Sequence, residues 1–596
     1  MKATEADVVR IEPGIGHHPG RPLLPEQQTL ASHSFATTAQ ALLARATMQP
    51  DALAHVFVGL DGGTEAVSYL DLLTAAQRFA ALFTAHGVGR GDRVIICMDT
   101  CAKVVAAFHG AGLIGAVPVM LAMPLGAANV PAWTRKLAQA IAAVGAKAAL
   151  VDMLVALAAR EPVIQAADCA LLTCAKLPPP EALTPPSVAP DEIAYIQFTS
   201  GTTSTPKPVI ITYGSLLANT RGIAETGQWH PDDLVCLWLP LFHDMGLVSG
   251  VLLPLLYGVP AVLLSPMSFV FTPSRWLWAI HYFRATLSAA PNFAYHICAH
   301  RLTDDDVVGL DLRSWRLAHN GAEFIHADSV DAFMRRFGPV GFRRETMYPV
   351  YGMAECVLAA TFPRPDEGPV VDLVDGNRLA LEGVAVPATA ETPRPLRIVS
   401  VGRPFPGHEL RIIDENGKAL PERQQGHVEL AGPSVTPGYF GDEASTNELM
   451  HDGWLRTGDT GYLADGRLYV YGRSKDIIIK AGRNYLPDSI ERAAGQVEGV
   501  REGCVAAFGV VNEEGGTEDL VVVFETRRKQ PDEISRLIRQ VSATIKREVG
   551  LAPNQIVAVP AQSLPKTTSG KLRRGDIRGR LLAGQLTVLG PGATTE

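Results

Sequence analysis

The stretch Tyr195-Ile-Gln-Phe-Thr-Ser-Gly-Thr-Thr-Ser-Thr-Pro-Lys207 decides how the rest of the chain is interpreted. It begins inside the apolar run 193–198, which predicts a buried strand. Seven residues that are all Gly, Ser or Thr follow this run, and Pro206 and Lys207 end the stretch. Backbone N–H groups, hydroxyl groups and a lysine ammonium are together typical of a loop that surrounds phosphate oxygens.

The stretch differs from the GxxxxGK[ST] phosphate loop. Pro206 stands where that motif has its second glycine, and Pro208 rather than Ser or Thr follows Lys207. Segments rich in Ser and Thr are also common in ordinary surface turns. By itself the stretch therefore predicts a strand and a turn, and a phosphate site only in combination with other motifs.

The composition is that of a globular protein with several domains. The chain has 596 residues, of which 47% are hydrophobic and 19% charged, so two to four domains or subdomains are expected. A net charge of −8 gives no reason to expect nucleic acid as a partner. Eight cysteines lack the spacing of a metal site or disulfide framework, and no apolar leader follows Met1. These features predict a cytoplasmic protein.

One apolar run is long enough to cross a membrane. No charged residue occurs from Met245 to Ser274. Six glycines and prolines interrupt this run, namely Gly250, Pro254, Gly258, Pro260, Pro266 and Pro273. The pattern therefore predicts short buried elements of an α/β core and no membrane span.

Alternating strands and helices predict a doubly wound α/β fold with two subdomains. The expected strands are 92–97, 148–151, 193–198, 234–239, 286–289 and 314–320, and the expected helices are 101–115, 133–144, 274–283 and 292–302. Residues 1–30 are predicted to be a flexible arm. Residues 363–397 contain six prolines and are predicted to be an irregular insertion, after which residues 401–471 show a β pattern.

The C-terminal part is predicted to be a separate, small α+β domain, residues 475–585. Its clearest element is a helix that begins at Pro531 and ends before Gly550. The large N-terminal part would then span residues 31–474. Residues 586–596 are predicted to be a disordered tail.

Five further stretches combine with the opening one. They are Leu239-Pro-Leu-Phe-His-Asp-Met-Gly246, Asn320-Gly-Ala-Glu323, Tyr351-Gly-Met-Ala-Glu355, Thr457-Gly-Asp459 with Gly472-Arg-Ser-Lys-Asp476, and Leu564-Pro-Lys-Thr-Thr-Ser-Gly-Lys571. In this order and spacing the set closely resembles the adenylate-forming enzymes, over about residues 35 to 580.

Within that superfamily the chain most resembles the fatty acyl-AMP ligases. The resembling residues include Trp238 to Leu247, Pro291-Asn-Phe-Ala-Tyr295, Ser314-Trp-Arg316 and Gly482-Arg-Asn484. The resemblance implies two α/β subdomains, a distorted β-barrel subdomain and a mobile C-terminal lid. It also places an insertion at residues 363–397.

The resemblance implies a reaction in which a fatty acid carboxylate attacks the α-phosphate of ATP in the presence of Mg²⁺. The acyl group would then pass to the phosphopantetheine thiol of a separate acyl carrier protein. Such a reaction is chiefly a task of positioning and electrostatic stabilisation. The β- and γ-phosphates would contact Thr199, Ser200, Gly201, Thr202, Thr203, Ser204 and Lys207.

The same resemblance assigns the remaining roles. Lys571 would approach the α-phosphate as a catalytic residue, Glu355 and Thr199 would hold Mg²⁺, and Lys475 would be the hinge of the lid. Asp459 would bind the ribose hydroxyls with help from Arg473. The adenine would lie among Asn320, Gly321, Ala322, Glu323, Tyr351, Gly352 and Met353.

Ordinary structural roles remain open for several of these residues. Glu355 could be a solvated residue, Tyr351 a core aromatic and Lys571 a surface lysine. His243 would lie beside the substrate carboxylate, or it could equally be a core histidine. The uncharged run with Trp276, Phe293 and Tyr295 could line an acyl pocket, although core packing would explain it as well.

Two departures from the family pattern affect the phosphate loop and the lid. Ser204 and Pro208 stand where glycine is more frequent, and Pro208 has no N–H to donate to a phosphate. Asn484-Tyr-Leu-Pro487 replaces Asn-His-Tyr-Pro. Neither change removes a charged group, so an active enzyme is expected.

Three alternatives compete with a fatty acyl-AMP ligase. An acyl-CoA ligase would use free coenzyme A, but the insertion and Gly482-Arg-Asn484 favour a carrier protein. An amino-acid adenylation domain would need Asp after Phe242, where the chain has His243. A catalytically silent sensor would not need Glu355, Asp459, Arg473 and Lys571 together.

Overall fold

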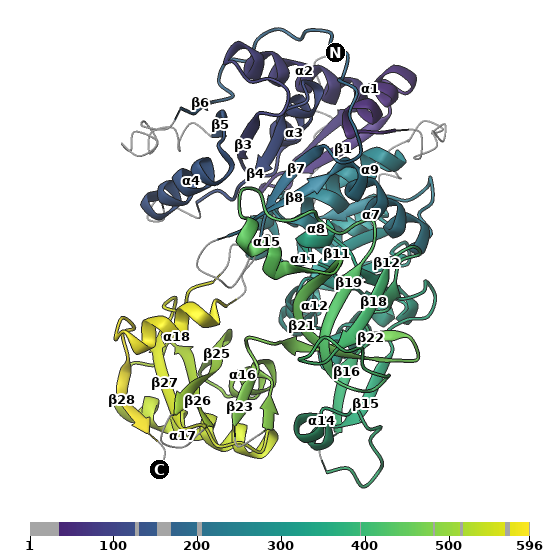
Figure 1. The fold of residues 1–596 in the computed structure, drawn as a ribbon. Coiled ribbons are helices and arrows are strands. Elements are labelled where there is room, and N and C mark those ends of the chain that lie inside the picture. The colour runs from purple at the N-terminus through teal and green to yellow at the C-terminus, as the bar shows by residue number, and fades with distance from the viewer. Residues whose placement is uncertain are drawn as a thin grey trace.

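The computed structural model describes residues 35–124, 130–151, 168–199, 206–393, 395–480, 483–512, 517–566 and 572–594. These residues form a large N-terminal part and a smaller C-terminal domain, which is yellow-green and yellow at the lower left of Figure 1. The predicted arm 1–30, the predicted phosphate-binding residues Ser200 to Ser204 and the predicted catalytic Lys571 lie outside the described residues.

A six-stranded sheet forms the first half of the large part. Its strands follow the order β6-β5-β3-β4-β7-β8, and each neighbouring pair is parallel except β7 and β8. The strands are β3 (Arg93–Cys97), β4 (Val117–Met120), β5 (Ala148–Val151), β6 (Ala170–Leu172), β7 (Ile193–Phe198) and β8 (Pro208–Thr212). Helix α3 (Ala102–Leu113) connects β3 to β4, and α4 (Val130–Val144) lies between β4 and β5. The predicted strands 92–97, 148–151 and 193–198 are confirmed.

A seven-stranded sheet forms the second half, in the order β13-β12-β11-β9-β10-β1-β2. Its strands are β1 (Leu53–Val58), β2 (Thr64–Ser68), β9 (Val235–Leu237), β10 (Ala261–Leu264), β11 (Leu287–Pro291), β12 (Leu317–Gly321) and β13 (Met347–Pro349). Apart from the helices within residues 244–271, which are described below, the other described α-helices up to residue 337 are α1 (Thr38–Met48), α2 (Tyr69–Ala85), α7 (Tyr213–Thr226), α11 (Ser274–Phe283), α12 (Asn292–Arg301) and α13 (Ala327–Phe337). Strand β1 pairs in parallel with β10, so an N-terminal segment completes the second sheet.

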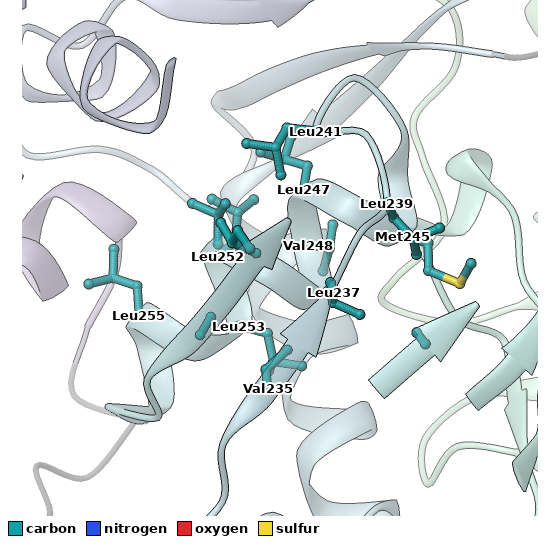
Figure 2. Close-up of a cluster of buried hydrophobic side chains, with 14 of the residues drawn as sticks. Val235, Leu237, Leu239, Leu241, Met245, Leu247, Val248, Leu252, Leu253 and Leu255 are labelled. Carbon is teal, nitrogen blue, oxygen red and sulfur yellow. The ribbon is translucent and has the colours of Figure 1, made fainter. Parts of the chain in front are cut away.

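The uncharged run Met245 to Ser274 folds into short buried elements, as predicted. It contains most of α8 (Asp244–Leu247), the π-helix η5 (Val248–Leu252), α9 (Leu253–Tyr257), β10 and α10 (Pro266–Phe271). Figure 2 shows its leucine and valine side chains packed with those of β9, and Leu252 and Leu253 are fully buried. Gly258 ends α9 at a φ of 71°, a left-handed conformation that glycine adopts readily. Within the described residues no helix has the length and apolar character needed to cross a membrane.

The β pattern after residue 401 forms a sheet of β18 (Glu409–Ile413), β19 (Gly426–Ala431), β20 (Met450–His451), β21 (Trp454–Ala464) and β22 (Arg467–Arg473). The irregular insertion predicted at 363–397 is wrong in part. Strands β15 (Val371–Asp375) and β16 (Pro395–Val399) pair antiparallel, and α14 (Gly376–Glu382) follows β15 between them. A partner strand twenty residues away supplies hydrogen bonds that the proline content does not predict. Two short strands, β14 (Thr361–Phe362) and β17 (Arg403–Pro404), form a separate antiparallel pair.

The C-terminal segment has a hydrophobic core of its own, which includes Ile478, Ile490, Val522 and Val541. Its elements are β23 (Ile478–Lys480), β24 (Arg483–Tyr485), α16 (Pro487–Gly495), β25 (Val500–Asn512), β26 (Thr517–Thr526), α17 (Pro531–Glu548), β27 (Gln555–Pro560), α18 (Arg574–Leu582) and β28 (Leu589–Thr594). The predicted helix at Pro531 is confirmed, with Leu537, Val541 and Ile545 buried.

The prediction of a disordered tail at 586–596 is wrong for most of that segment. Strand β28 pairs antiparallel with β27, and Thr594 lies opposite Gln555. The segment Leu589-Gly-Pro-Gly has little intrinsic preference for a strand. The exposed edge of β27 provides the hydrogen bonds that hold it.

Candidate active site

The predicted site residues gather where strands of the two sheets end. Thr199 directly follows β7, Gly321 ends β12, and Tyr351 comes two residues after β13. In open α/β sheets, ligands bind at the carboxyl ends of the parallel strands. The fold therefore brings together three stretches that are far apart in sequence.

Asp459 is held between an aromatic and a basic side chain. The Tyr351 hydroxyl donates a hydrogen bond to Asp459 Oδ2 at 2.6 Å, and Arg473 Nε lies 3.2 Å from Oδ1. Strand pairing sets this contact, because Asp459 of β21 lies opposite Arg473 of β22. Burial and the Asp459 carboxylate raise the pKa of Tyr351, so its phenol remains a donor. The carboxylate still has free lone pairs that could accept hydrogen bonds from a sugar.

Glu355 is a buried carboxylate in the short helix Ala354–Cys356, and it accepts a 2.8 Å hydrogen bond from the Tyr439 hydroxyl at Oε1. Burial raises the pKa of Glu355, whereas the hydrogen bond from Tyr439 and the charge of Arg473 oppose that rise. The hydrogen bond from Tyr439 engages Oε1, and the Glu355 backbone N–H also contributes a hydrogen bond to the carboxylate. A carboxylate has several lone pairs, so it can still bind a hard cation such as Mg²⁺. Glu355 therefore fits the predicted role of metal ligand.

The described ends of the predicted phosphate loop are joined by two hydrogen bonds. Thr199 N donates to Lys207 O at 3.0 Å, and Lys207 N donates to Thr199 Oγ1 at 3.1 Å. The Lys207 ammonium lies 4.9 Å from the centre of the Tyr439 ring. Pro208 begins β8, where its carbonyl accepts from Phe440 N at 2.8 Å. Pro208 has no N–H to donate, but its carbonyl oxygen still accepts this hydrogen bond.

The predicted adenine-binding stretch is placed by β12. Asn320 is fully buried, and no hydrogen-bond partner in the described part of the chain contacts its Oδ1. A buried acceptor of this kind is costly unless a ligand group or water reaches it. Ala322 has a φ of 65°. Glu323 Oε1 accepts from Phe293 N at 2.5 Å at the start of α12, so its carboxylate has a structural role.

Gly352 and Met353 form the turn between Tyr351 and Glu355. A Cβ atom on Gly352 would lie 1.9 Å from the carbonyl oxygen of Leu358, so only glycine fits there. The Met353 carbonyl accepts from Cys356 N at 3.1 Å. This turn fixes Tyr351 relative to Glu355.

His243 lies next to Asp244 and close to Glu355. Its Nδ1 is 2.6 Å from Asp244 Oδ1, and both side chains are largely buried. The same Nδ1 also accepts a hydrogen bond from Met245 N at 3.3 Å, so the ring caps the short helix that begins at Asp244. Asp244 contributes to the raised pKa of Glu355, which places this pair near the predicted metal ligand.

The predicted hinge, Lys475, is exposed in the turn between β22 and β23. Its neighbour Asp476 accepts a 2.9 Å hydrogen bond from Arg574, which also contacts Asp488 and Glu491. Arg574 begins α18, three residues after Lys571. The turn at Lys475 is therefore tied to the element that follows the predicted catalytic lysine.

The residues suggested as walls of an acyl pocket are mostly core residues. Trp276 and Tyr295 are fully buried, and their side chains donate hydrogen bonds to Ser288 and to the His319 carbonyl. Phe293 is partly exposed and packs near Trp238 at a ring-centre distance of 6.1 Å. Core packing thus accounts for Trp276 and Tyr295, and Phe293 is the member that a substrate could touch.

The geometry agrees with a comparison of the chain with known families. The family model described as AMP-binding enzyme matches residues 42–440. The chain belongs to the AMP-binding enzyme family.

Relatives of this AMP-binding enzyme include a putative ligase from Mycobacterium tuberculosis. It is 36% identical over 84% of this chain and 92% of its own length. A medium-chain-fatty-acid–[acyl-carrier-protein] ligase, JamA, from Moorena producens is 36% identical over 67% of this chain and 70% of its own. A solved structure from a study of fatty acyl-adenylate ligases from E. coli and L. pneumophila superimposes with a TM-score of 0.85. It is 34% identical and covers 94% of this chain and 99% of its own.

Three residues that contact the candidate site or its neighbours were not predicted from the sequence. Tyr439 contacts Glu355 and Lys207, Asp244 contacts His243, and Gln197 Nε2 donates to the Phe242 carbonyl at 2.6 Å. The available signal for Tyr439 was an aromatic residue after Pro437-Gly438, which is also common in ordinary turns. Only the contacts identify these residues.

Proposed function

We propose that this chain is a fatty acyl-AMP ligase that uses ATP and Mg²⁺ and passes the acyl group to a phosphopantetheinylated carrier protein. The observation that carries the proposal is the convergence of Asp459, Arg473 and Glu355. The negative charge of Asp459 is the largest cause of the raised pKa of Arg473, and the charge of Glu355 also raises it. The names of the relatives supply the substrate class, and the free cysteines accord with a cytoplasmic location.

In the proposed reaction, a carboxylate oxygen of the fatty acid forms a bond to the α-phosphorus, and the bond from that phosphorus to pyrophosphate breaks. Asp459 accepts hydrogen bonds from the ribose while Tyr351 and Arg473 hold it. Lys207 and the preceding loop bind the β- and γ-phosphates. When bound, Mg²⁺ would neutralise phosphate charge, and Glu355 with Thr199 would hold it.

The choice of a carrier protein as acceptor is supported by an ion-pair chain that joins β16, the second strand of the β15–β16 pair, to the C-terminal domain. Asp328 of α13 contacts Arg397 of β16 at 2.8 Å through Oδ1, and Arg492 of α16 through Oδ2. In the fatty acyl-AMP ligases that the sequence resembles, the insertion restricts the lid. This chain of contacts is a physical route for such a restriction.

Asp328→Asn should raise the ratio of acyl-CoA to acyl-carrier product by up to about fivefold, because each exposed ion pair stabilises by at most about 1 kcal/mol. The rate of adenylate formation should stay unchanged. The measurement is a competition assay with equal concentrations of coenzyme A and carrier. Asp304→Asn is the matched control, since it removes an exposed carboxylate paired with Arg336 within the large part. If Asp328→Asn and Asp304→Asn give the same ratio of acyl-CoA to acyl-carrier product, the Asp328 ion pairs do not restrict the lid.

The function itself is tested by incubating the purified protein with ATP, Mg²⁺ and fatty acids of graded chain length. Coenzyme A or a phosphopantetheinylated carrier is then added, and the products are identified by mass spectrometry. We expect acyl-AMP to form whichever acceptor is added, and we expect the acyl group to be transferred to the carrier. Abundant acyl-CoA would instead identify an acyl-CoA ligase, and adenylates of amino acids or aryl acids an adenylation enzyme of another class. ATP binding without any adenylate would identify a sensor.

A further inference from the structure

Tyr439 stands between the two groups that the proposed function assigns to the phosphates and to the metal. It follows Gly438 in the segment that leads from β19 to α15 (Glu443–Leu449). Its backbone forms an isolated bridge with Val209 of β8, the strand that continues from the phosphate loop. Neither the sequence motifs nor the proposed reaction assigns this residue a role.

The side chain of Tyr439 contacts both groups at once. Its hydroxyl donates to Glu355 Oε1 at 2.8 Å, and its ring centre lies 4.9 Å from Lys207 Nζ. Tyr439 is 8% exposed and Glu355 is 7% exposed, so solvent screens these interactions little. Burial and the Glu355 charge both raise the pKa of Tyr439, so its hydroxyl keeps the proton that it donates.

The surrounding backbone holds the tyrosine at a fixed position. Ile210 N donates to the Gly438 carbonyl at 3.0 Å, and Phe440 N donates to the Pro208 carbonyl at 2.8 Å. Thr436 N donates to the Glu355 carbonyl at 2.8 Å, while its hydroxyl donates to the Ile210 carbonyl at 2.6 Å. The segment 436–440 thus links β8 to the turn that carries Glu355.

A lysine and a carboxylate this near to one aromatic ring would otherwise tend to pair directly. No ion pair joins Lys207 to Glu355 among the described residues; the face of the ring contacts the ammonium and its hydroxyl binds the carboxylate. A cation on the face of an aromatic ring is attracted by its quadrupole. A hydrogen bond to one carboxylate oxygen orients the other.

We propose that Tyr439 is a positioning residue that keeps Lys207 and Glu355 apart and aims them separately, the ammonium at the phosphates and Glu355 Oε2 at Mg²⁺. The proposal rests on the proposed function, because it requires that both groups meet Mg·ATP. It gives Tyr439 two separable contributions, one from the hydroxyl and one from the ring.

Tyr439→Phe removes the hydroxyl and keeps the ring. We expect this variant to need about tenfold more Mg²⁺ for half-maximal ATP binding, because partners of a metal ligand typically contribute 10- to 100-fold to metal affinity. ATP binding at saturating Mg²⁺, and the KM for the fatty acid, should stay near the wild-type values. Tyr439→Leu also removes the ring and should weaken ATP binding several-fold even at saturating Mg²⁺.

The measurement is calorimetric titration of ATP at a series of Mg²⁺ concentrations with no fatty acid present, followed by steady-state kinetics. Tyr462→Phe is the matched control, since the Tyr462 hydroxyl donates to Asp372 Oδ2 at 2.8 Å, a similar buried pair in the hairpin region. If Tyr439→Leu does not fold, as judged by circular dichroism, Tyr439→Phe alone decides the test.

The outcomes separate this inference from the proposed function. If the wild-type protein binds no Mg·ATP, the proposed function fails, and the inference fails with it. If the wild-type protein binds Mg·ATP and Tyr439→Phe shows an unchanged Mg²⁺ requirement, only the inference is overturned. A merely structural tyrosine would lower the melting temperature and leave the Mg²⁺ requirement equal to that of Tyr462→Phe.

Discussion

Replacing Lys571 with alanine is expected to slow adenylate formation about a thousandfold, because a charge aimed at the reacting phosphate contributes mainly in the transition state. ATP binding should stay nearly intact, since the proposed site binds the ribose through Asp459 and the outer phosphates through Lys207. Lys571 is placed by sequence alone. The described residues on either side of its segment, Lys566 and Leu572, pair in an antiparallel bridge, so both ends of the segment are anchored together.

Pyrophosphate release and acyl-AMP would be measured in single-turnover reactions, and ATP binding by calorimetry. Lys566→Ala is the matched control, because Lys566 belongs to the same motif and its ammonium donates to the Gly503 carbonyl at 2.9 Å. Undiminished adenylate formation in Lys571→Ala would reject the assignment. Equal losses in both variants would indicate that the lysines act on the stability of the C-terminal domain.

The second large effect is expected for Asp459→Asn, which should weaken ATP binding about a hundredfold. A hydrogen bond to a charged group contributes about 1.5–3 kcal/mol, and the amide has one acceptor oxygen where the carboxylate has two. The substitution also removes the charge that pairs with Arg473. The loss should appear in the Kd for ATP more than in the rate of the bound complex.

Comparison of ATP with 2′-deoxy-ATP identifies the contact. Wild-type protein should prefer ATP, and Asp459→Asn should lose most of that preference. Asp372→Asn is the control, because Asp372 is likewise held between a tyrosine and an arginine, Tyr462 and Arg423. If Asp459→Asn binds both nucleotides as tightly as wild type, the ribose lies elsewhere.

Local patterns in the sequence were sufficient for most individual elements. The apolar run 193–198, the helix 274–283 and the helix that begins at Pro531 are found as β7, α11 and α17. Each is defined by neighbouring residues, through a continuous apolar run or a helical spacing with a proline at its start. The same reasoning correctly divided the uncharged run 245–274 into short buried elements, because proline and glycine act locally.

Elements that depend on distant partners were not predictable in the same way. Strand β1 joins the second sheet through β10, about two hundred residues later, and β28 exists because β27 offers a free edge. The pairing of β15 with β16 was not predicted, because the segment between them contains prolines. The residues of a strand carry little information about a partner strand that is remote in sequence.

The sequence by itself determined the family resemblance and the chemical types at the site: a hydroxyl-rich loop with Lys207, the carboxylates Glu355 and Asp459, and Lys571. The tertiary structure decided how the described members of that set meet. A register shift between Thr460 and Gly461 accompanies the pairing of Asp459 with Arg473, and Tyr439 is brought against Glu355 from 84 residues away. Spacing along a chain cannot specify such contacts, because they depend on strand register and on the packing of segments that are joined only through the folded core.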